Sequence, residues 1–340
     1  MRTPLITAAA LLTTATNAQT LIVLNKAEAS ASLLNPHTGE TDTVIPVGAG
    51  PHEAEVSPDG NTVVVCNYGQ QTHGNTLSVI DLQSQTVTKT IDLGNNQRPH
   101  GIVFSADGER VYVTTERSRK LLIVNIQTGD IEQAIDTNAS GSHMVAVTPD
   151  ESRAFTTNLG SGSVTAIDLA TNSFIKELKT DQQAEGVATH PTRPEVWISN
   201  RAGNSVSVVD TNTLEILDTF ECASFPIRLE ITPDGTTAIV SNARSGDITF
   251  FDVETRAELG RLSMNAVAKG DADQRLFSDQ FGSSPVPVGI QITPDSKTAY
   301  VANTNADVIT VVDIESRTIK GRLTAGKEPD GMAWSPLPKR

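Results

Sequence analysis

A short pattern of apolar and polar positions recurs along most of the chain. In its clearest copy, residues 102–105 are small and apolar, residues 106–108 read Ala-Asp-Gly, and residues 111–115 are β-branched or aromatic. Asp-Gly favours a tight turn because glycine accepts a positive φ, and the flanking runs suit pleated strands. The pattern therefore predicts a strand, a turn and a second strand. Related copies stand at residues 51–60, 147–150, 231–235 and 292–295.

Each of these strand pairs is followed by a second pair. The third strand of the unit is β-branched and ends in Asp or Asn, at Asp81, Asn125, Asp168, Asp210, Asp252 and Asp313. Successive members of this set are 44, 43, 42, 42 and 61 residues apart. Four short strands with a period of 42 to 44 residues are typical of a β-propeller, in which each blade buries its faces against its neighbours. We therefore predict an all-β propeller with four-stranded blades.

The two ends of the chain predict how the ring closes. Residues 21–48 contain three strands and lack an inner one, whereas residues 329–336 form one apolar strand. Edge strands carry unpaired backbone groups, so a blade built from both ends would pair the exposed edges. With that blade the propeller has seven blades, closed by the C-terminal inner strand pairing with the N-terminal three strands. Residues 19–340 then form a single domain.

Some strand sequences carry a family resemblance. Residues 112–115 read Tyr-Val-Thr-Thr and residues 299–303 read Ala-Tyr-Val-Ala-Asn, and Ser-Pro-Asp-Gly forms the turn at residues 57–60. They resemble the YVTN family of bacterial seven-bladed propeller repeats, and the similarity covers residues 20–336. The resemblance implies a fold rather than a function, because the wider group includes lactonases, lyases, metal- and haem-carrying domains and non-catalytic surface proteins.

The first residues are typical of a cleaved signal peptide. Arg2 precedes an apolar run over residues 5–12, and Thr16-Asn17-Ala18 is a small-x-small cleavage pattern. We expect residues 1–18 to be removed and the protein to be exported, to the periplasm or outside the cell. No later stretch has the length of a transmembrane helix. The formal net charge of −14 argues against nucleic acid as a partner.

The 61-residue interval contains an insertion at about 265–284. It joins the outer strand of one blade to the inner strand of the next, on the face where the inner strands begin. Long loops in compact domains are usually functional, and Leu276, Phe277 and Phe281 offer apolar anchors. We expect an ordered segment over the mouth of the central channel. A tolerated surface insertion is the alternative.

One register near the start of the inner strands holds three of the six histidines in the chain. They come from consecutive blades, whose sheets lie close enough near the axis for inward side chains to meet. This column is His52, His100, His143, Glu185, Ile227, Val288 and Asp330, and the next position reads Glu53, Gly101, Met144, Gly186, Arg228, Gly289 and Gly331.

Imidazoles and carboxylates around a cavity suit two kinds of chemistry. One is a divalent metal such as Zn²⁺, held by His52, His100 and His143, which polarises a carbonyl or activates water. The other is acid–base catalysis, with Arg228 holding a substrate carboxylate. The expected catalytic residues are His143, His100, Glu185 and Arg228, and the expected substrate contacts are Glu53, Met144, Asp330 and Arg275.

Three classes of function therefore remain open. The first is a lyase or lactone hydrolase that acts on a small carboxylate- or carbonyl-bearing molecule at the channel mouth. The second is a non-catalytic extracytoplasmic protein that binds a small ligand or a protein partner on this face. The third is a redox partner that holds haem or copper through the histidines. The cofactor is unknown, a divalent metal being the first candidate, and histidines that only bond neighbouring loops are the competing interpretation.

The second strand of six units ends in asparagine. Repetition in nearly every unit indicates a structural role in the turn rather than chemistry. The positions are Asn25, Asn67, Asn158, Asn200, Asn242 and Asn303.

Overall fold

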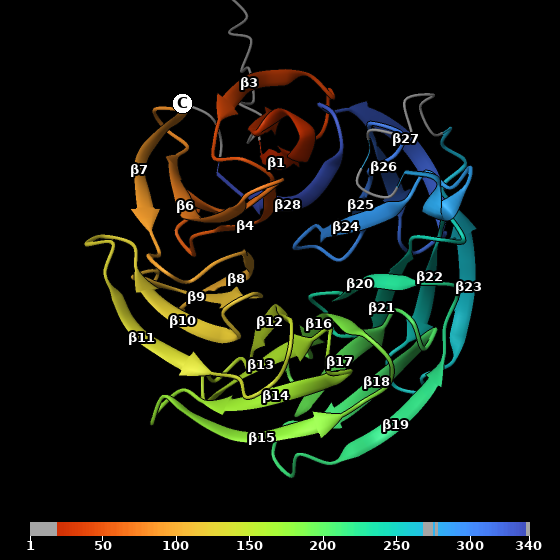
Figure 1. Ribbon diagram of the computed structural model, residues 1–340. Helices are drawn as coiled ribbons and strands as arrows, with labels where there is room; N and C mark the ends of the chain where they lie inside the picture. Colours follow the sequence, from red (N-terminus) through yellow and green to blue (C-terminus); the bar gives the residue numbers. More distant parts are fainter. Residues whose placement is uncertain (1–18, 268–274, 276–277, 338–340) are drawn as a thin grey trace, which may run out of the picture.

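The computed structural model describes residues 19–267, 275 and 278–337. These residues form seven four-stranded antiparallel sheets around a central channel, which confirms the predicted propeller (Figure 1). The predicted signal peptide at residues 1–18 lies outside the described residues, so export stays a prediction. Within the described part of the chain, no helix is long and apolar enough to cross a membrane.

Blades 1 to 3 follow one another in chain order, each beginning with the strand closest to the channel. Blade 1 contains β4 (Pro51–Val56), β5 (Thr62–Gly69), β6 (His73–Asp81) and β7 (Thr86–Asp92). Blade 2 contains β8 (Pro99–Phe104), β9 (Arg110–Thr115), β10 (Lys120–Asn125) and β11 (Ile131–Asp136). Blade 3 contains β12 (Ser142–Val147), β13 (Arg153–Asn158), β14 (Ser163–Asp168) and β15 (Ser173–Lys179).

Blades 4 to 6 have the same organisation. Blade 4 contains β16 (Ala184–Thr189), β17 (Glu195–Asn200), β18 (Ser205–Asp210) and β19 (Ile216–Glu221). Blade 5 contains β20 (Pro226–Ile231), β21 (Thr237–Asn242), β22 (Asp247–Asp252) and β23 (Glu258–Ser263). Blade 6 contains β24 (Pro287–Ile292), β25 (Thr298–Asn303), β26 (Val308–Asp313) and β27 (Thr318–Thr324).

Blade 7 joins the two ends of the chain, as predicted. It contains β28 (Pro329–Ser335), β1 (Thr20–Asn25), β2 (Ser30–Leu34) and β3 (Thr41–Pro46), with the short 3₁₀ helix η1 (Lys26–Glu28) after β1. Figure 1 shows the blue strand β28 beside the red N-terminal strands. In the antiparallel pair β1–β28, Leu21 lies opposite Trp334. The ring is therefore closed by backbone pairing between sequence ends.

The core lies between the blades, and the middle strands explain why. Successive side chains of a strand point to opposite faces. In β5, Val63 and Val65 pack against blade 7, whereas Val64 and Cys66 pack against blade 2. Both faces of the strand are buried, so its sequence is a continuous apolar run rather than an alternating one.

The asparagines have the predicted structural role. Asn67 Nδ2 donates to Thr76 Oγ1 at 2.9 Å and to Ser78 Oγ at 3.0 Å on the third strand. Its Oδ1 accepts from the backbone N–H of Gly48 in the loop that leads into blade 1. The side chain thus ties a turn, a strand and the entering loop together. Asn25 and Asn200 make equivalent bonds in their own blades.

Each inner strand begins with a β-bulge. In β4, Pro51 lies opposite Asn67 and Ala54 lies opposite Val65. Residues 52 and 53 on β4 therefore share one opposing residue, Cys66, on β5. A bulge of this kind redirects side chains locally, and it turns both the second and the third residue of the strand toward the channel. Neighbouring inner strands then approach so closely that a Cβ on the third residue of β8, Gly101, would lie 2.7 Å from the backbone of Met144.

The described part of the insertion includes Arg275 and the 3₁₀ helix η3 (Ser278–Phe281). Phe281 is buried in a cluster with Ile227 and Val288, the second residues of the inner strands of blades 5 and 6. Arg275 forms an ion pair with Asp307, with 2.7 Å between Nη1 and Oδ1. The other two proposed anchors, residues 276 and 277, lie outside the described residues.

Candidate functional site

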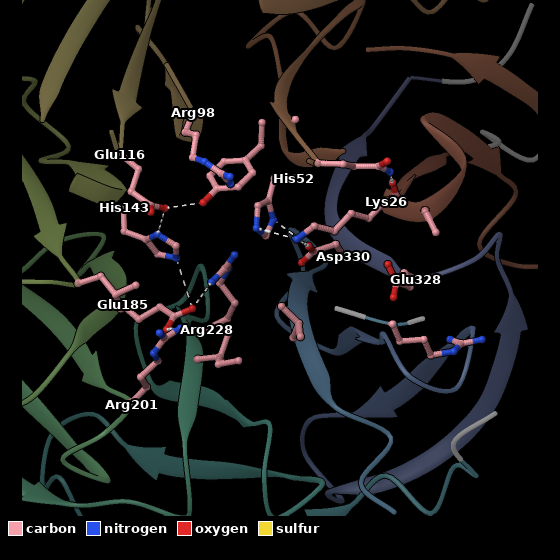
Figure 2. Close-up of a pocket in the computed structure, with 18 of the residues that line it drawn as sticks. Lys26, His52, Arg98, Glu116, His143, Glu185, Arg201, Arg228, Glu328 and Asp330 are labelled. Atoms are coloured by element: carbon pink, nitrogen blue, oxygen red, sulfur yellow. Dashed lines mark hydrogen bonds and ion pairs between the residues drawn. The ribbon is translucent and has the colours of Figure 1, made fainter. Parts of the chain in front are cut away.

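A cavity of about 840 Å³ occupies the mouth of the channel on the face where the inner strands begin, and we call it the mouth cavity (Figure 2). It is lined by the second residues of inner strands, namely His52, His143, Glu185, Ile227, Val288 and Asp330, together with loop residues between the strands. A second cavity of about 350 Å³, the lower cavity, lies farther along the channel. Arg228 lines both cavities.

The mouth cavity has more positive than negative side chains, unlike the protein as a whole. The chain contains 26 lysines and arginines against 40 aspartates and glutamates. The lining of this cavity instead contains six basic and four acidic side chains. They are Lys26, Arg98, Arg201, Arg228, Arg275 and Lys327, and Glu116, Glu185, Glu328 and Asp330. A local excess of positive charge favours an anionic ligand.

The three histidines of the column lie together, as the sequence predicts. The ring centroids of His52 and His100 are 4.1 Å apart, and those of His100 and His143 are 3.6 Å apart. Tyr68 contacts His52 and His100 with its ring edge-on. His100 is fully buried in the middle of this stack and does not line the mouth cavity, whereas its two neighbours do.

His143 is held between two carboxylates. Its Nδ1 lies 3.2 Å from Glu116 Oε2 and its Nε2 lies 3.3 Å from Glu185 Oε1. Burial alone would lower the pKa of His143, but the hydrogen bonds to Glu116 and Glu185 outweigh it and raise that pKa. Both ring nitrogens donate only in the imidazolium form, so this arrangement stabilises a charged histidine.

Glu185 also connects His143 to two arginines. Its Oε2 lies 2.7 Å from Arg201 Nη1 and its Oε1 lies 3.4 Å from Arg228 Nη1. Arg228 additionally donates from Nε to Glu53 Oε1 at 3.0 Å. The sequence predicts that Arg228 holds a substrate carboxylate, but in the structure two carboxylates of the protein already contact its guanidinium.

Asp330 forms a second charged group on the opposite wall of the cavity. Its Oδ2 lies 2.7 Å from His52 Nδ1 and 3.1 Å from Lys26 Nζ. Lys26 Nζ also lies 2.9 Å from His52 Nε2, and because an ammonium only donates, this nitrogen accepts. Burial disfavours the charged carboxylate of Asp330, yet His52 and Lys26 hold its pKa well below the usual range.

The bulges explain why the predicted substrate contacts do not all lie at the mouth. Six of the seven second residues of the inner strands line the mouth cavity, whereas four third residues, Glu53, Met144, Arg228 and Gly289, line the lower cavity. Glu53 and Met144 are third residues and line the lower cavity instead, whereas Asp330 and Arg275 do line the mouth. The glycines at this third position in four blades are compatible with a bulge, but they do not indicate toward which cavity the neighbouring side chains turn.

Several lining residues were missed by the sequence analysis, and they share a position. Each directly follows the last or near-last residue of a second strand, next to the position of the repeated asparagine, and Tyr68 still lies within the longer β5. The seven residues at this position are Lys26, Tyr68, Glu116, Leu159, Arg201, Ala243 and Thr304, and the first five line the mouth cavity. The position before is asparagine in six blades, whereas this one differs in all seven. Such a contrast between neighbouring columns was the available signal.

Two acidic side chains in the lower cavity have pKa values above the usual range for glutamate. Burial, with repulsion from Glu53, raises the pKa of Glu55 to about 8. Burial, with repulsion from Glu55 and Glu53, likewise raises the pKa of Glu230 to about 8. A carboxyl group with a higher pKa in the folded state binds more protons when folded, so the free energy of unfolding falls as pH rises from about 4.5 to about 8.

Replacement of Glu230 by Gln should therefore reduce the loss of stability on raising the pH. The amide cannot ionise, so Glu230→Gln should gain melting temperature relative to the original protein between about pH 5 and pH 8. Thermal unfolding at several pH values measures the difference. Glu315→Gln, a change at an exposed position, is the control. Parallel curves for Glu230→Gln and the original protein would contradict the raised pKa.

The fold and the site together define a seven-bladed propeller with a charged, histidine-containing cavity at the mouth of its channel. Residues 24–273 match the family described as "Lactonase, 7-bladed beta-propeller", and the chain belongs to this family. The narrower resemblance to YVTN repeats stays a prediction.

Three individual relatives match parts of the chain. The chain is 22% identical over 238 residues to the uncharacterized protein YncE of Salmonella typhi, covering 66% of this chain and 65% of the relative. It is 26% identical over 310 residues to the uncharacterized protein YwhL of Bacillus subtilis, covering 82% and 65%. The chain thus spans less than two thirds of the length of these relatives. A shorter match, 28% identical over 116 residues, links 32% of the chain to 24% of the dihydro-heme d1 dehydrogenase of Pseudomonas aeruginosa.

Proposed function

We propose that the mouth cavity binds a small molecule that carries a carboxylate, and that the protein hydrolyses a lactone in this molecule or acts on it as a lyase. The positive lining of the cavity in an otherwise acidic protein is the observation that carries the proposal. Membership of the lactonase family supports the hydrolytic reaction, although a fold alone does not define a substrate.

Arg98 is the best anchor for the carboxylate. Its guanidinium lies 4.4 Å from the centroid of the Tyr68 ring, and Nε donates to His73 Nδ1 at 2.6 Å. Among the described residues no carboxylate forms an ion pair with Arg98, in contrast to Arg201 and Arg228. A planar guanidinium fixed by stacking can receive a ligand carboxylate with two parallel hydrogen bonds.

His143 is the best proton donor for lactone opening. In this reaction a water molecule adds to the carbonyl carbon and gives up a proton, the ring C–O bond breaks, and the leaving alkoxide takes a proton. The charged His143, held by Glu116 and Glu185, can supply the second proton. The His52 imidazole, whose pKa is lowered by burial, can receive the first one at Nε2 once the Lys26 ammonium that donates to this nitrogen turns to the ligand. Lys26 can stabilise the developing oxyanion.

A panel of carboxylate-bearing lactones, assayed by proton release in the presence of EDTA, tests this function. His143→Gln should lower kcat by roughly 100- to 10,000-fold, and Arg98→Met should chiefly raise KM. His37→Gln, in an exposed turn, is the control and should change neither parameter. Calorimetry with the hydrolysed products measures binding independently of turnover. If neither turnover nor carboxylate binding occurs, the proposed function is wrong, whereas binding without turnover indicates a non-catalytic ligand-binding protein.

The match to the haem d1 enzyme favours a second candidate, a haem-type ligand in the mouth cavity. His52 lines this cavity beside Tyr68 and could provide an axial nitrogen. Titration with haemin should then produce a shifted Soret band that His52→Ala abolishes.

A further inference from the structure

His100 is a buried polar side chain without a hydrogen bond. It is 0% exposed, and neither ring nitrogen has a hydrogen-bond partner among the described residues. Its ring packs between those of His52 and His143, so packing fixes its orientation while both nitrogens stay unpaired. Buried polar atoms in folded proteins are nearly always paired, and a pair that is missing requires an explanation.

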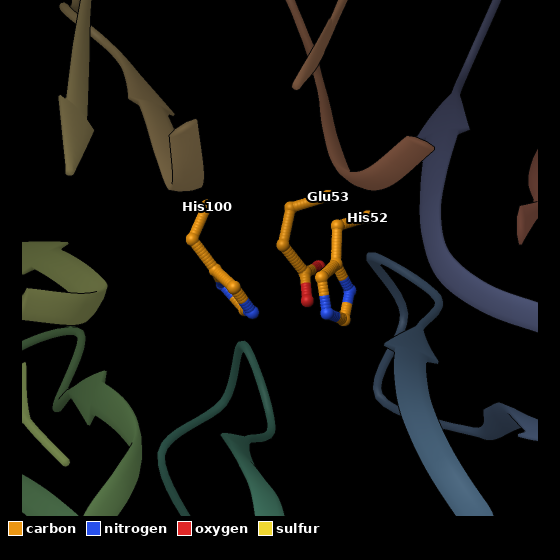
Figure 3. Close-up of side chains that lie close together, drawn as sticks. All are labelled: His52, Glu53 and His100. Atoms are coloured by element: carbon orange, nitrogen blue, oxygen red, sulfur yellow. The ribbon is translucent and has the colours of Figure 1, made fainter. Parts of the chain in front are cut away.

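Two other potential metal ligands lie beside it. One ligand atom each from His52, Glu53 and His100 fall within 4.8 Å of one another. Figure 3 shows the three side chains approaching one another from strands β4 and β8. Residues 52 and 53 are successive, and in a regular strand they would point to opposite faces. The bulge at the start of β4 is what brings both to one centre.

The two carboxylate oxygens of Glu53 have different surroundings. Arg228 donates to Oε1 of Glu53, and no hydrogen bond from a described residue reaches Oε2. On the neighbouring strand β28, a Cβ on Gly331 would lie 2.9 Å from this Oε2. The same Cβ would lie 2.3 Å from the backbone oxygen of His52, so the glycine allows β28 and β4 to approach closely at this point. Oε1 of Glu53 thus accepts hydrogen bonds from Arg228, whereas Oε2 can bind a cation.

We propose that His52, Glu53 and His100 bind one divalent transition-metal ion where the mouth cavity meets the lower cavity. Two imidazoles and one carboxylate are a ligand set found in catalytic zinc sites and in mononuclear iron sites, and they leave coordination positions open.

The ligand set differs from the one that the sequence predicts. Both nitrogens of His143 face carboxylates, so Glu53 takes its place in the group. Lys26 Nζ lies 2.9 Å from His52 Nε2, where an ion bound to that nitrogen would displace it. The displaced ammonium keeps Asp330 as a partner, with 3.1 Å between Nζ and Oδ2. A cation is therefore already favoured at this place.

Metal titration of the EDTA-treated protein tests the site without any substrate. Calorimetry with Zn²⁺ should show one ion per chain, and Co²⁺ should produce a visible absorption band from the bound ion. Loss of a ligand should weaken binding by more than the roughly 10- to 100-fold that loss of an outer partner costs. We expect this for His100→Ala and Glu53→Gln, and no change for His37→Ala in an exposed turn.

Two results would overturn the metal site. One is the absence of Zn²⁺ and Co²⁺ binding to the original protein. The other is unchanged affinity in Glu53→Gln, which keeps the size of the side chain and an oxygen for Arg228, so it tests the site even if His100→Ala fails to fold. The inference goes beyond the proposed function. Lactone hydrolysis is assayed in EDTA and metal binding without substrate, so either can fail alone.

Discussion

A chain that ends before residue 325 should lose most of the stability of the intact ring. The deletion removes β28, whose seven residues are all buried and which pairs with β1 along its length. Met332 and Trp334 pack against blade 6, and Ala333 packs in the cluster shared with blade 1. The deletion therefore exposes both an inner edge and two inter-blade surfaces.

The expected loss can be compared with the stability of a typical domain. Removal of a buried Trp side chain alone costs about 3–5 kcal/mol, and each backbone hydrogen bond adds about 0.5–1.5 kcal/mol. Native domains are stable by only about 5–15 kcal/mol. We expect the truncated chain to lack a cooperative urea transition by circular dichroism. A synthetic peptide of residues 325–340 should restore it, and an unchanged transition without the peptide would contradict closure by β28.

Replacement of Arg228 by Met should have the second largest effect. Arg228 is 4% exposed and lies between Glu53 and Glu185. Removal of one partner from a buried ion pair leaves an uncompensated charge and costs about 3–5 kcal/mol. Urea denaturation at neutral pH should therefore show a loss of this size for Arg228→Met.

Two further variants make this test specific. In Arg228→Met combined with Glu53→Gln, the loss should be smaller than the sum of the single losses, because the orphaned carboxylate is gone. Arg110→Met removes an arginine from a surface ion pair with Glu132, and we expect it to cost only about 0–1 kcal/mol. Equal losses for Arg228→Met and Arg110→Met would show that the buried network adds no stability.

The fold could be predicted from the sequence because the same pattern of strands and turns occurs in nearly every blade. Asp-Gly turns, β-branched strands and the asparagine column recur with nearly constant spacing. Each copy of the repeat therefore supports the strand assignments made in the other copies. The convergence of His52, His100 and His143 was also predictable, since a ring brings equivalent positions of its repeats to one axis.

The partners of these side chains were not predictable in the same way. Glu116 reaches His143 from the end of β9 in the preceding blade, and this contact depends on how two blades pack rather than on spacing within one. Glu53 and Met144 line the lower cavity, and the glycines at the same position in four other blades indicate a bulge but not the direction of the side chains around it. The positions of these residues along the inner strands were therefore predicted correctly, but the directions of their side chains were not.

The two neighbouring columns at the ends of the second strands separate architecture from recognition. The asparagine bonds the turn to the third strand, whereas the next residue differs in every blade and lines the mouth cavity in five of them. Five blades thus each present one variable residue to the mouth cavity, on a frame that is nearly the same from blade to blade. New specificities could arise by replacing these residues one at a time, with little change to the blades that present them.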